Sequence, residues 1–86
     1  MRFIVTERFT RAYRDLPDEL QRKADKALRL LQDNPKHPSL RLKKIQGTPG
    51  IWEARVDRSC RITLEMQADC LLLRNIGKHD DALGNP

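Results

Sequence analysis

The residues best suited to chemistry are arginines that alternate with apolar side chains along two predicted strands within residues 50–66. Such alternation predicts a sheet with one face on a core and the other in water. Pairing Val56 with Cys60 puts the apolar side chains of both strands on one side, and it sets Arg55 directly opposite Arg61. Two like charges at a cross-strand pair are unfavourable. Because the sequence carries this cost without an evident structural gain, we expect an anion to bind there.

A third predicted strand brings another arginine to the same face. A second tight turn precedes residues 70–77, which again read as a strand. Pairing across this turn puts Arg74 opposite Thr63, on the side away from the core. Arg55, Arg61 and Arg74 are therefore expected to converge on one open sheet face.

The first part of the chain predicts a strand and two helices. Residues 2–6 contain an apolar run typical of a short strand, and Thr6 is a good N-cap for the helix that follows. Apolar residues at helical spacing indicate an amphipathic helix over residues 9–16 and a second helix from about Pro17 to Asp33. Because the connection between them is so short, the two helices should form an antiparallel hairpin.

Residues 36–50 contain prolines and glycines and predict a long loop, with at most a short extended piece. A loop of this length in a small domain is more often functional than idle. It carries His37 and the cations Arg41, Lys43 and Lys44.

The predicted element order is β-α-α-β-β-β. This order indicates an α+β fold in which the helical hairpin packs on one side of a mainly antiparallel four-stranded sheet. The sequence leaves open whether the first strand pairs with an edge strand or a central one. With 86 residues, the chain (residues 1–86) is expected to form a single domain.

The charge balance favours an anionic partner. The net charge is +5, which suits nucleic acid, an acidic protein or, less well, a membrane surface. The alternative is that the charge only aids solubility. No apolar run is long enough to span a membrane and no signal peptide is evident, so we expect a cytoplasmic protein. Cys60 and Cys70 are expected to be reduced thiols, and the two histidines and two cysteines show no metal-binding spacing.

The chain resembles the RelE/ParE superfamily of toxins from type II toxin–antitoxin pairs, over nearly its whole length. No single piece is specific, but the ordered set is fairly so. The residues that carry the resemblance are Phe9 to Leu16 with Pro17, Asn34-Pro35, His37 to Leu40, Leu42 to Gly47, Gly50 to Arg55, Arg61-Ile62, and Ile76-Gly77 before His79.

The resemblance implies a small basic toxin that a cognate antitoxin holds inactive, as a hetero-oligomer of the two proteins. In the RelE-like branches the released toxin enters the ribosome and cuts mRNA without a metal or other cofactor. Those enzymes carry basic residues on the open sheet face, which Arg55, Arg61 and Arg74 would match, and His79 would match a histidine found after the last strand. Lys43, Lys44 and Arg41 would bind RNA phosphates, with a solvated basic loop as the alternative.

RNA cleavage of this kind has the ribose 2′-hydroxyl attack the adjacent phosphate. Histidine titrates in the range needed to accept or deliver a proton, so His79 is our candidate acid or base. Arginines offer fixed charge and forked donors to phosphate oxygens, and Arg61 is the leading candidate for that contact. The alternative for Arg61 is a salt bridge with Glu53 or Glu65, and for His79 it is a tail residue without a role.

Two other functions stay open at this point. The ParE-like branch inhibits DNA gyrase and needs no nuclease site. A catalytically degenerate member would only bind its antitoxin. This alternative arises because Cys60 stands where many relatives have an aromatic residue, and because no aromatic residue follows His79.

Overall fold

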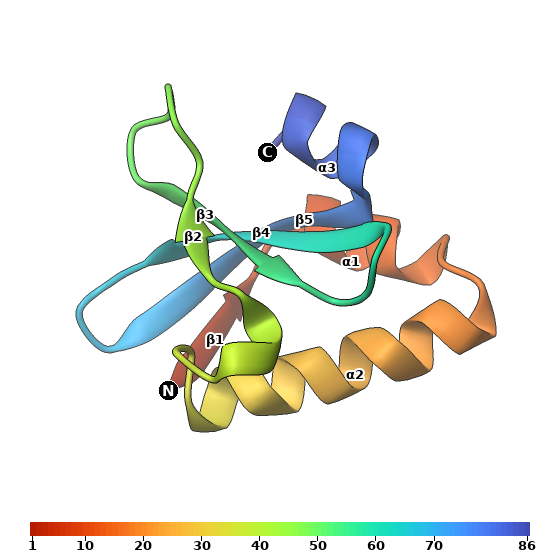
Figure 1. Cartoon of the computed structure of the whole chain (residues 1–86), viewed down its shortest axis with the longest axis horizontal. Coiled ribbons are helices and arrows are strands. Elements are labelled where there is room, and N and C mark those ends of the chain that lie inside the picture. The colour runs from red at the N-terminus through yellow and green to blue at the C-terminus, as the bar shows by residue number, and fades with distance from the viewer.

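The computed structural model describes residues 1–86 and shows a five-stranded sheet between a helical hairpin and a short C-terminal helix (Figure 1). The sheet has the strand order β1-β5-β4-β3-β2. In chain order the elements are β1 (Arg2–Val5), α1 (Glu7–Arg14), α2 (Asp18–Asp33), the 3-10 turn η1 (Pro38–Leu40), β2 (Lys43–Lys44), β3 (Ile51–Arg55), β4 (Cys60–Met66), β5 (Cys70–Lys78) and α3 (His79–Gly84).

The predicted α+β fold is confirmed, with two additions. The loop between α2 and β3 contributes the two-residue strand β2, which makes the sheet five-stranded, and the tail forms α3. The question of the first strand is also answered. β1 lies at one edge of the sheet and runs parallel to β5, whereas all other neighbouring strands are antiparallel.

Thr6 caps α1, and α2 ends at Asp33, as the sequence predicts, whereas α1 ends at Arg14 and not at Leu16. The Thr6 hydroxyl accepts a hydrogen bond from the Phe9 N–H at 3.1 Å, which satisfies one of the free amides of the first turn of α1. Pro17 stands just before α2, where its missing N–H costs nothing. The Tyr13 hydroxyl donates to Asp25 at 2.7 Å and ties the two helices together.

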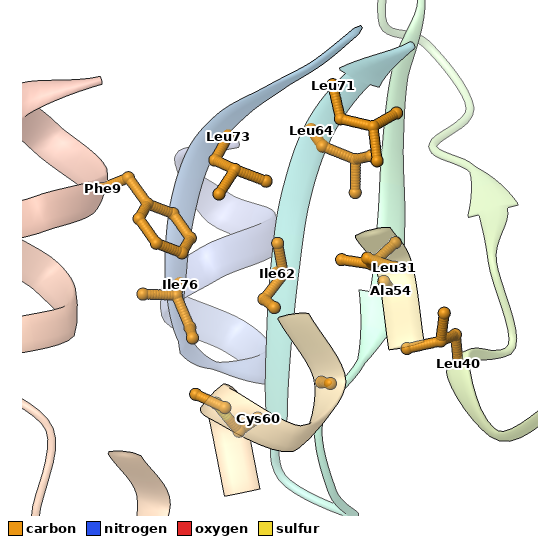
Figure 2. Close-up of a cluster of buried hydrophobic side chains, with 12 residues drawn as sticks. Phe9, Leu31, Leu40, Ala54, Cys60, Ile62, Leu64, Leu71, Leu73 and Ile76 are labelled. Carbon is orange, nitrogen blue, oxygen red and sulfur yellow. The ribbon is translucent and has the colours of Figure 1, made fainter. Parts of the chain in front are cut away.

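The main core lies between the helical hairpin and the sheet (Figure 2). The apolar stripes of α1 and α2 face this core, and every second side chain of the strands points into it from the sheet. Its members are Phe9, Ala24, Ala27, Leu31, Leu40, Ala54, Cys60, Ile62, Leu64, Leu71, Leu73 and Ile76. Trp52 is one of the apolar residues on the predicted core side of β3, and it packs against this cluster but is only partly buried.

The predicted register of β3 and β4 is confirmed, because Ala54 pairs with Ile62 and Arg55 with Arg61. The predicted position of Arg74 opposite Thr63 is wrong. Thr63 pairs with Asn75, and the register shifts there so that Arg74 is an extra residue in β5.

The cause of this bulge is the spacing of the apolar residues in β5. Leu73 and Ile76 are both buried in the same core, yet they are three positions apart, which a regular strand would place on opposite faces. One extra residue at Arg74 restores the alternation and returns Ile76 to the core side.

The expectation that the second face of the sheet lies in water is also wrong. α3 folds back onto this face, against β4 and β5. Thr63 of β4 and Ala82 of α3 are fully buried there, and on the neighbouring strand β3 Glu53 is 6% exposed. The face is built of polar and charged residues, but it is a covered surface with its own partners.

Cys60 and Cys70 are both buried and unpaired, as the sequence predicts. Burial, together with the nearby Asp57 carboxylate, raises the pKa of the Cys60 thiol to about 11. The thiol is therefore protonated at neutral pH and is not a nucleophile. No helix of the chain has the length and apolar character needed to cross a membrane.

Candidate functional site

The turn between β3 and β4 anchors two of the predicted site residues. The Asp57 carboxylate accepts hydrogen bonds from the N–H groups of Ser59 (2.9 Å) and Cys60 (2.8 Å), which fixes the turn. The guanidinium of Arg61 donates to the carbonyl of Asp57 at 2.6 Å. The backbone N–H of His79 donates to the carbonyl of Ser59. One turn therefore holds Arg61 and the start of α3 at the same end of the sheet.

Asp57 itself is stabilised as a carboxylate. Partial burial raises its pKa, but the two backbone hydrogen bonds and the Lys23 ammonium at 3.4 Å outweigh that effect, so the net result is a lowered pKa. The turn thus keeps its acceptor ionised through neutral and mildly acidic pH.

Arg61 lies mostly buried along the sheet, with 16% of its side chain exposed. Its Nε is 3.6 Å from the carboxylate of Glu53, which is itself nearly buried and also lies 4.0 Å from the Lys43 ammonium. The salt bridge with Glu53, which the sequence offers as the alternative for Arg61, is therefore present. The Glu53 carboxylate thus lies between two cations, Arg61 and Lys43, and helps to hold the Arg61 guanidinium in place.

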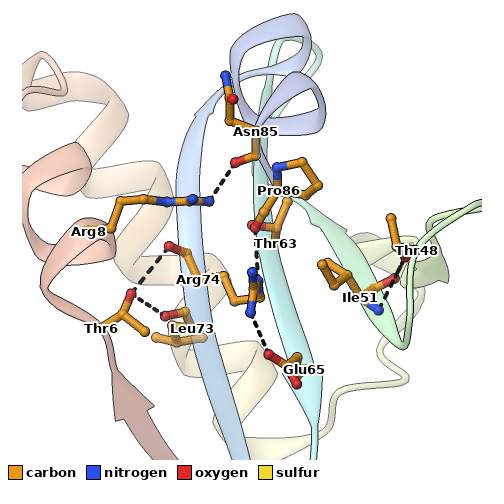
Figure 3. A network of polar contacts seen from close by, with 10 residues as sticks. All are labelled: Thr6, Arg8, Thr48, Ile51, Thr63, Glu65, Leu73, Arg74, Asn85 and Pro86. Atoms are coloured by element: carbon orange, nitrogen blue, oxygen red, sulfur yellow. Dashed lines mark hydrogen bonds and ion pairs between the residues drawn. The ribbon is translucent and has the colours of Figure 1, made fainter.

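Arg74 occupies the bulge of β5 and reaches across β4 (Figure 3). Its Nη1 is 2.6 Å from the Glu65 carboxylate, and its Nε donates to the carbonyl of Pro86 at 3.0 Å. The Thr63 hydroxyl donates to the same carbonyl at 3.1 Å. The Pro86 oxygen thus takes up the Nε donor of Arg74, which the ion pair with Glu65 leaves unused.

Arg8 belongs to the same cluster, and sequence reasoning missed it. Its guanidinium donates to the carbonyl of Asn85, and it lines a cavity of about 140 Å³ together with Thr6 and Arg74 (Figure 3). Thr6 closes this corner, because its hydroxyl donates to the Leu73 carbonyl at 2.8 Å. The signal in the sequence was the capping threonine two residues before Arg8, although nothing there showed that β1 lies beside β5.

Arg55 is the cross-strand partner of Arg61, as predicted, but it is held differently. Its side chain has no hydrogen bond and no carboxylate partner, whereas Arg61 and Arg74 have both. It lines a cavity of about 280 Å³ at the free edge of β3, where Lys23 and Lys26 of α2 also lie. Asp57, which is ion-paired with Lys23, lines the same cavity, so Arg55 and Lys26 are the cations there without a carboxylate partner.

His79 is the first residue of α3, and about half of its side chain is exposed. Its Nδ1 lies 3.5 Å from the carboxylate of Asp80, a long and weak contact. The imidazole is therefore accessible to a ligand, and its neighbour Asp80 is the nearest group that could orient it.

The predicted phosphate-binding cations of the loop are divided between two faces. In the sheet, Lys43 lies opposite Glu53, on the same face as Arg61. Lys44 lies opposite Trp52, on the helix side. Arg41 is exposed on the helix side as well, where it lines a cavity with Trp52. The three cations therefore do not form one continuous surface. No group of three or more His, Cys, Asp or Glu side chains is placed to hold a metal ion.

The architecture defines a class: a small α+β fold with a helical hairpin on one face of a mainly antiparallel sheet and cationic residues on the other. The fold is that of the RelE/ParE toxins, which confirms the resemblance seen in the sequence at the level of structure. No family model and no curated protein matches the chain.

Solved structures of this class superpose well on the chain despite low sequence identity. YafQ from Escherichia coli strain BL21(DE3) has a TM-score of 0.79 at 15% identity, over 94% of this chain and 97% of that one. RelE in the RelB–RelE antitoxin–toxin complex of Methanococcus jannaschii gives 0.75 at 16%, over 91% and 92%. The YoeB/ParE toxin of Agrobacterium tumefaciens gives 0.77 at 15%, over 92% and 99%.

Proposed function

We propose that this protein is the toxin of a type II toxin–antitoxin pair and acts as a ribosome-dependent mRNA endonuclease. The proposal rests on its fold and on one local observation. The turn between β3 and β4 binds the Arg61 guanidinium through the Asp57 carbonyl and the backbone N–H of His79 through the Ser59 carbonyl, and about half of the His79 side chain is exposed. A fixed cation next to a group that can carry a proton is the minimum that phosphodiester transfer to a 2′-hydroxyl requires.

In the proposed reaction the 2′-oxygen attacks the adjacent phosphorus and the bond to the 5′-oxygen breaks. His79 either takes the proton of the 2′-hydroxyl or delivers one to the leaving 5′-oxygen. Arg61 neutralises the charge that builds on the phosphorane. The products are a 2′,3′-cyclic phosphate and a 5′-hydroxyl, with no metal ion or other cofactor taking part.

Arg74 and Arg8 would bind the flanking phosphates. Both now donate to carbonyl oxygens at the end of the chain, those of Pro86 and Asn85. A phosphate oxygen accepts the same hydrogen bond as the Asn85 carbonyl and adds a negative charge, so RNA can replace this contact of Arg8 favourably. Lys43, on the same face, would extend the cationic track toward the edge of the sheet.

The proposed partners follow from this surface. The side of the sheet that carries α3, with Arg61 and Arg74, is called the arginine face. An antitoxin that neutralises the toxin would cover this arginine face with an acidic segment or with an amphipathic helix. The substrate would be mRNA in the ribosomal A site, which places the activity in the cytoplasm.

A degenerate, antitoxin-binding role is the second candidate, and one observation favours it. Arg61 and Arg74 are each within ion-pairing distance of a carboxylate, Glu53 at 3.6 Å and Glu65 at 2.6 Å. Cations already neutralised in this way bind phosphate less strongly than free ones.

The test is cleavage of an mRNA on programmed ribosomes by the wild type and His79→Gln. Glutamine keeps a polar side chain but cannot transfer a proton, so we expect a loss of on the order of 100-fold or more in rate. Arg22→Ala, on the exposed side of α2, is the control that also removes a charge, and melting temperatures verify that all variants are folded. Wild-type cuts bearing a 2′,3′-cyclic phosphate support the nuclease.

Three other outcomes are decisive in different ways. Cuts of equal rate in the variant would move proton transfer away from His79. Absence of any cut, together with loss of DNA gyrase supercoiling, would replace the nuclease by a gyrase inhibitor. Absence of both activities, with antitoxin binding retained, would establish the degenerate module.

A further inference from the structure

A second cationic cavity lies on the helix side of the sheet, away from the arginine face. It has a volume of about 370 Å³, close to the lower end of the range of roughly 300–1,000 Å³ seen for small-molecule sites. The residues that line it come from the segments on either side of η1, between α2 and β2, and from β3 and β4, elements that Figure 1 labels. Its lining residues are Lys36, His37, Arg41, Leu42, Trp52 and Met66.

The floor of the cavity is apolar and partly open to water. Trp52 and Leu42 pack against the main core but stay only partly buried, and Met66 is 37% exposed. An indole that is fixed on one side by a core and accessible on the other offers a flat surface for a planar ligand. The alternation of Trp52 with Arg55 predicts a core residue and not a stacking surface, so the partial exposure of the indole is a finding of the structure.

The rim consists of hydrogen-bond donors without any carboxylate. Neither Lys36 nor Arg41 takes part in any of the ion pairs of the chain. The Nδ1 of His37 accepts a hydrogen bond from the Ser39 N–H at 3.2 Å. In the neutral ring the proton must therefore be on Nε2, which is left as a donor.

Arg41 adopts a conformation that this residue type rarely takes. Its φ of 44° and ψ of 45° lie in the left-handed region, and it is the one non-glycine residue of the chain with a positive φ. Arginine gains nothing there from its backbone, since glycine or asparagine would be less strained. Strain of this kind often marks a functional position, and here it sets the guanidinium at the rim of the cavity.

We propose that this cavity binds one nucleotide of a single-stranded RNA, with the base against Trp52 and its phosphate between Lys36 and Arg41. The inference rests on the proposed function, since it adds a second contact for the same RNA. β2 links the two sites, because Lys43 faces the arginine side and Lys44 faces the cavity side of one edge strand. An acidic peptide would satisfy the cations, but it would leave the indole and the Met66 side chain without a flat partner.

Trp52 reports directly on this site because it is the only tryptophan in the chain. We would titrate the protein with a trinucleotide of 2′-O-methyl RNA, which cannot be cleaved, and follow tryptophan fluorescence. Saturable quenching is expected, since a stacked base quenches indole emission. Inorganic phosphate and an acidic peptide of glutamates serve as comparison probes, and neither should quench at concentrations where the trinucleotide saturates.

The matched variants are Arg41→Gly, Lys36→Ala and, as a control for loss of charge, Arg29→Ala on the exposed side of α2. Arg41→Gly relieves the backbone strain, so it should not unfold the protein. It and Lys36→Ala should each weaken the trinucleotide about tenfold and lower the slope of log Kd against log salt by about one. The control should change neither.

The outcomes separate this proposal from the nuclease proposal. Quenching that is absent, or unchanged in both rim variants, would overturn the nucleotide site even if ribosomal cleavage is intact. Quenching by the acidic peptide and not by RNA would assign the cavity to a protein partner instead. Quenching lost in the rim variants supports the site whether or not the wild type cuts mRNA.

Discussion

The two faces of the sheet bury their residues by different means. On the helix side, Ile62, Leu64 and Leu73 are buried in one apolar cluster with side chains of α1 and α2. On the α3 side, Glu53 and Thr63 are equally buried, but each is matched by a polar partner. No buried side-chain nitrogen or oxygen lacks a hydrogen-bond partner. The first face depends on shape and water exclusion, and the second on specific pairs.

This difference bears on how each face can function. Close packing in the main core is disturbed as a whole when one of its side chains is removed. The main core is therefore a structural scaffold. Contacts from arginines to carbonyl oxygens can be exchanged one by one for contacts to phosphate, because the acceptor chemistry is the same. We therefore expect truncations within the main core to change stability, and substitutions of Arg8 and Arg74, which donate to carbonyl oxygens, to change binding.

The largest effect should come from Leu31→Ala, because this side chain is fully buried at the centre of the helix side. Loss of the side chain removes apolar burial and leaves a cavity, at a cost of about 2–5 kcal/mol in the free energy of unfolding. Leu28→Ala, one turn away on the same helix but only partly buried, is the matched control and should cost less. Urea denaturation measures both. Equal costs would mean that α2 is rotated relative to the core.

Glu53→Gln tests the paired face in the same way. The substitution leaves Arg61 mostly buried with only carbonyl oxygens as acceptors, so we expect a loss of about 1–3 kcal/mol in the free energy of unfolding. Glu65→Gln, whose partner Arg74 is more exposed, should cost less. A silent Glu53→Gln would show that the buried carboxylate contributes nothing net, which has precedent for buried ion pairs.

Asp57 should give the turn between β3 and β4 an acid-sensitive contribution to stability. Its pKa is lower in the folded protein than its ordinary value of 3.8, so the stabilisation is fully present above that value and is lost as the pH falls through the folded pKa. Asp57→Asn keeps an oxygen for Ser59 and Cys60 but loses the charge, at a cost below about 1 kcal/mol for this partly exposed pair with Lys23. Melting temperatures of both proteins should converge below pH 3.8. A constant difference at all pH values would contradict the lowered pKa.

The part of this fold that the sequence could predict is the part governed by alternation. The pairing of Arg55 with Arg61 follows from the apolar period together with the tight turn, because a one-residue slip would mix the faces. The bulge at Arg74 could have been found from the three-residue spacing of Leu73 and Ile76, since a strand cannot bury both without an extra residue.

The rest depends on contacts between segments far apart in the chain. The return of α3 onto the sheet is carried by the hydrogen bonds of Asn85 and Pro86 with Arg8, Asn75, Thr63 and Arg74. Residues 79–86 show no hydrophobic periodicity from which such contacts could be predicted. The same limit applies to Lys43 and Lys44, whose opposite faces follow from a two-residue strand too short to show a pattern.

The smallest stability effect, and the sharpest comparison, concerns the two paired arginines. Arg55→Ala should leave the free energy of unfolding unchanged or slightly higher, within about 0.5 kcal/mol, because it removes a cation that faces Arg61, lies near Lys23 and Lys26, and has no carboxylate of its own. Arg61→Ala should destabilise, because it strips the buried Glu53 of its nearest cation. Thermal melts of both variants measure the contrast. A clear loss of stability in Arg55→Ala would mean that Arg55 has a structural partner. A neutral Arg55→Ala that weakens RNA binding would instead show that this arginine is retained for its ligand, at the cost of repulsion in the free protein.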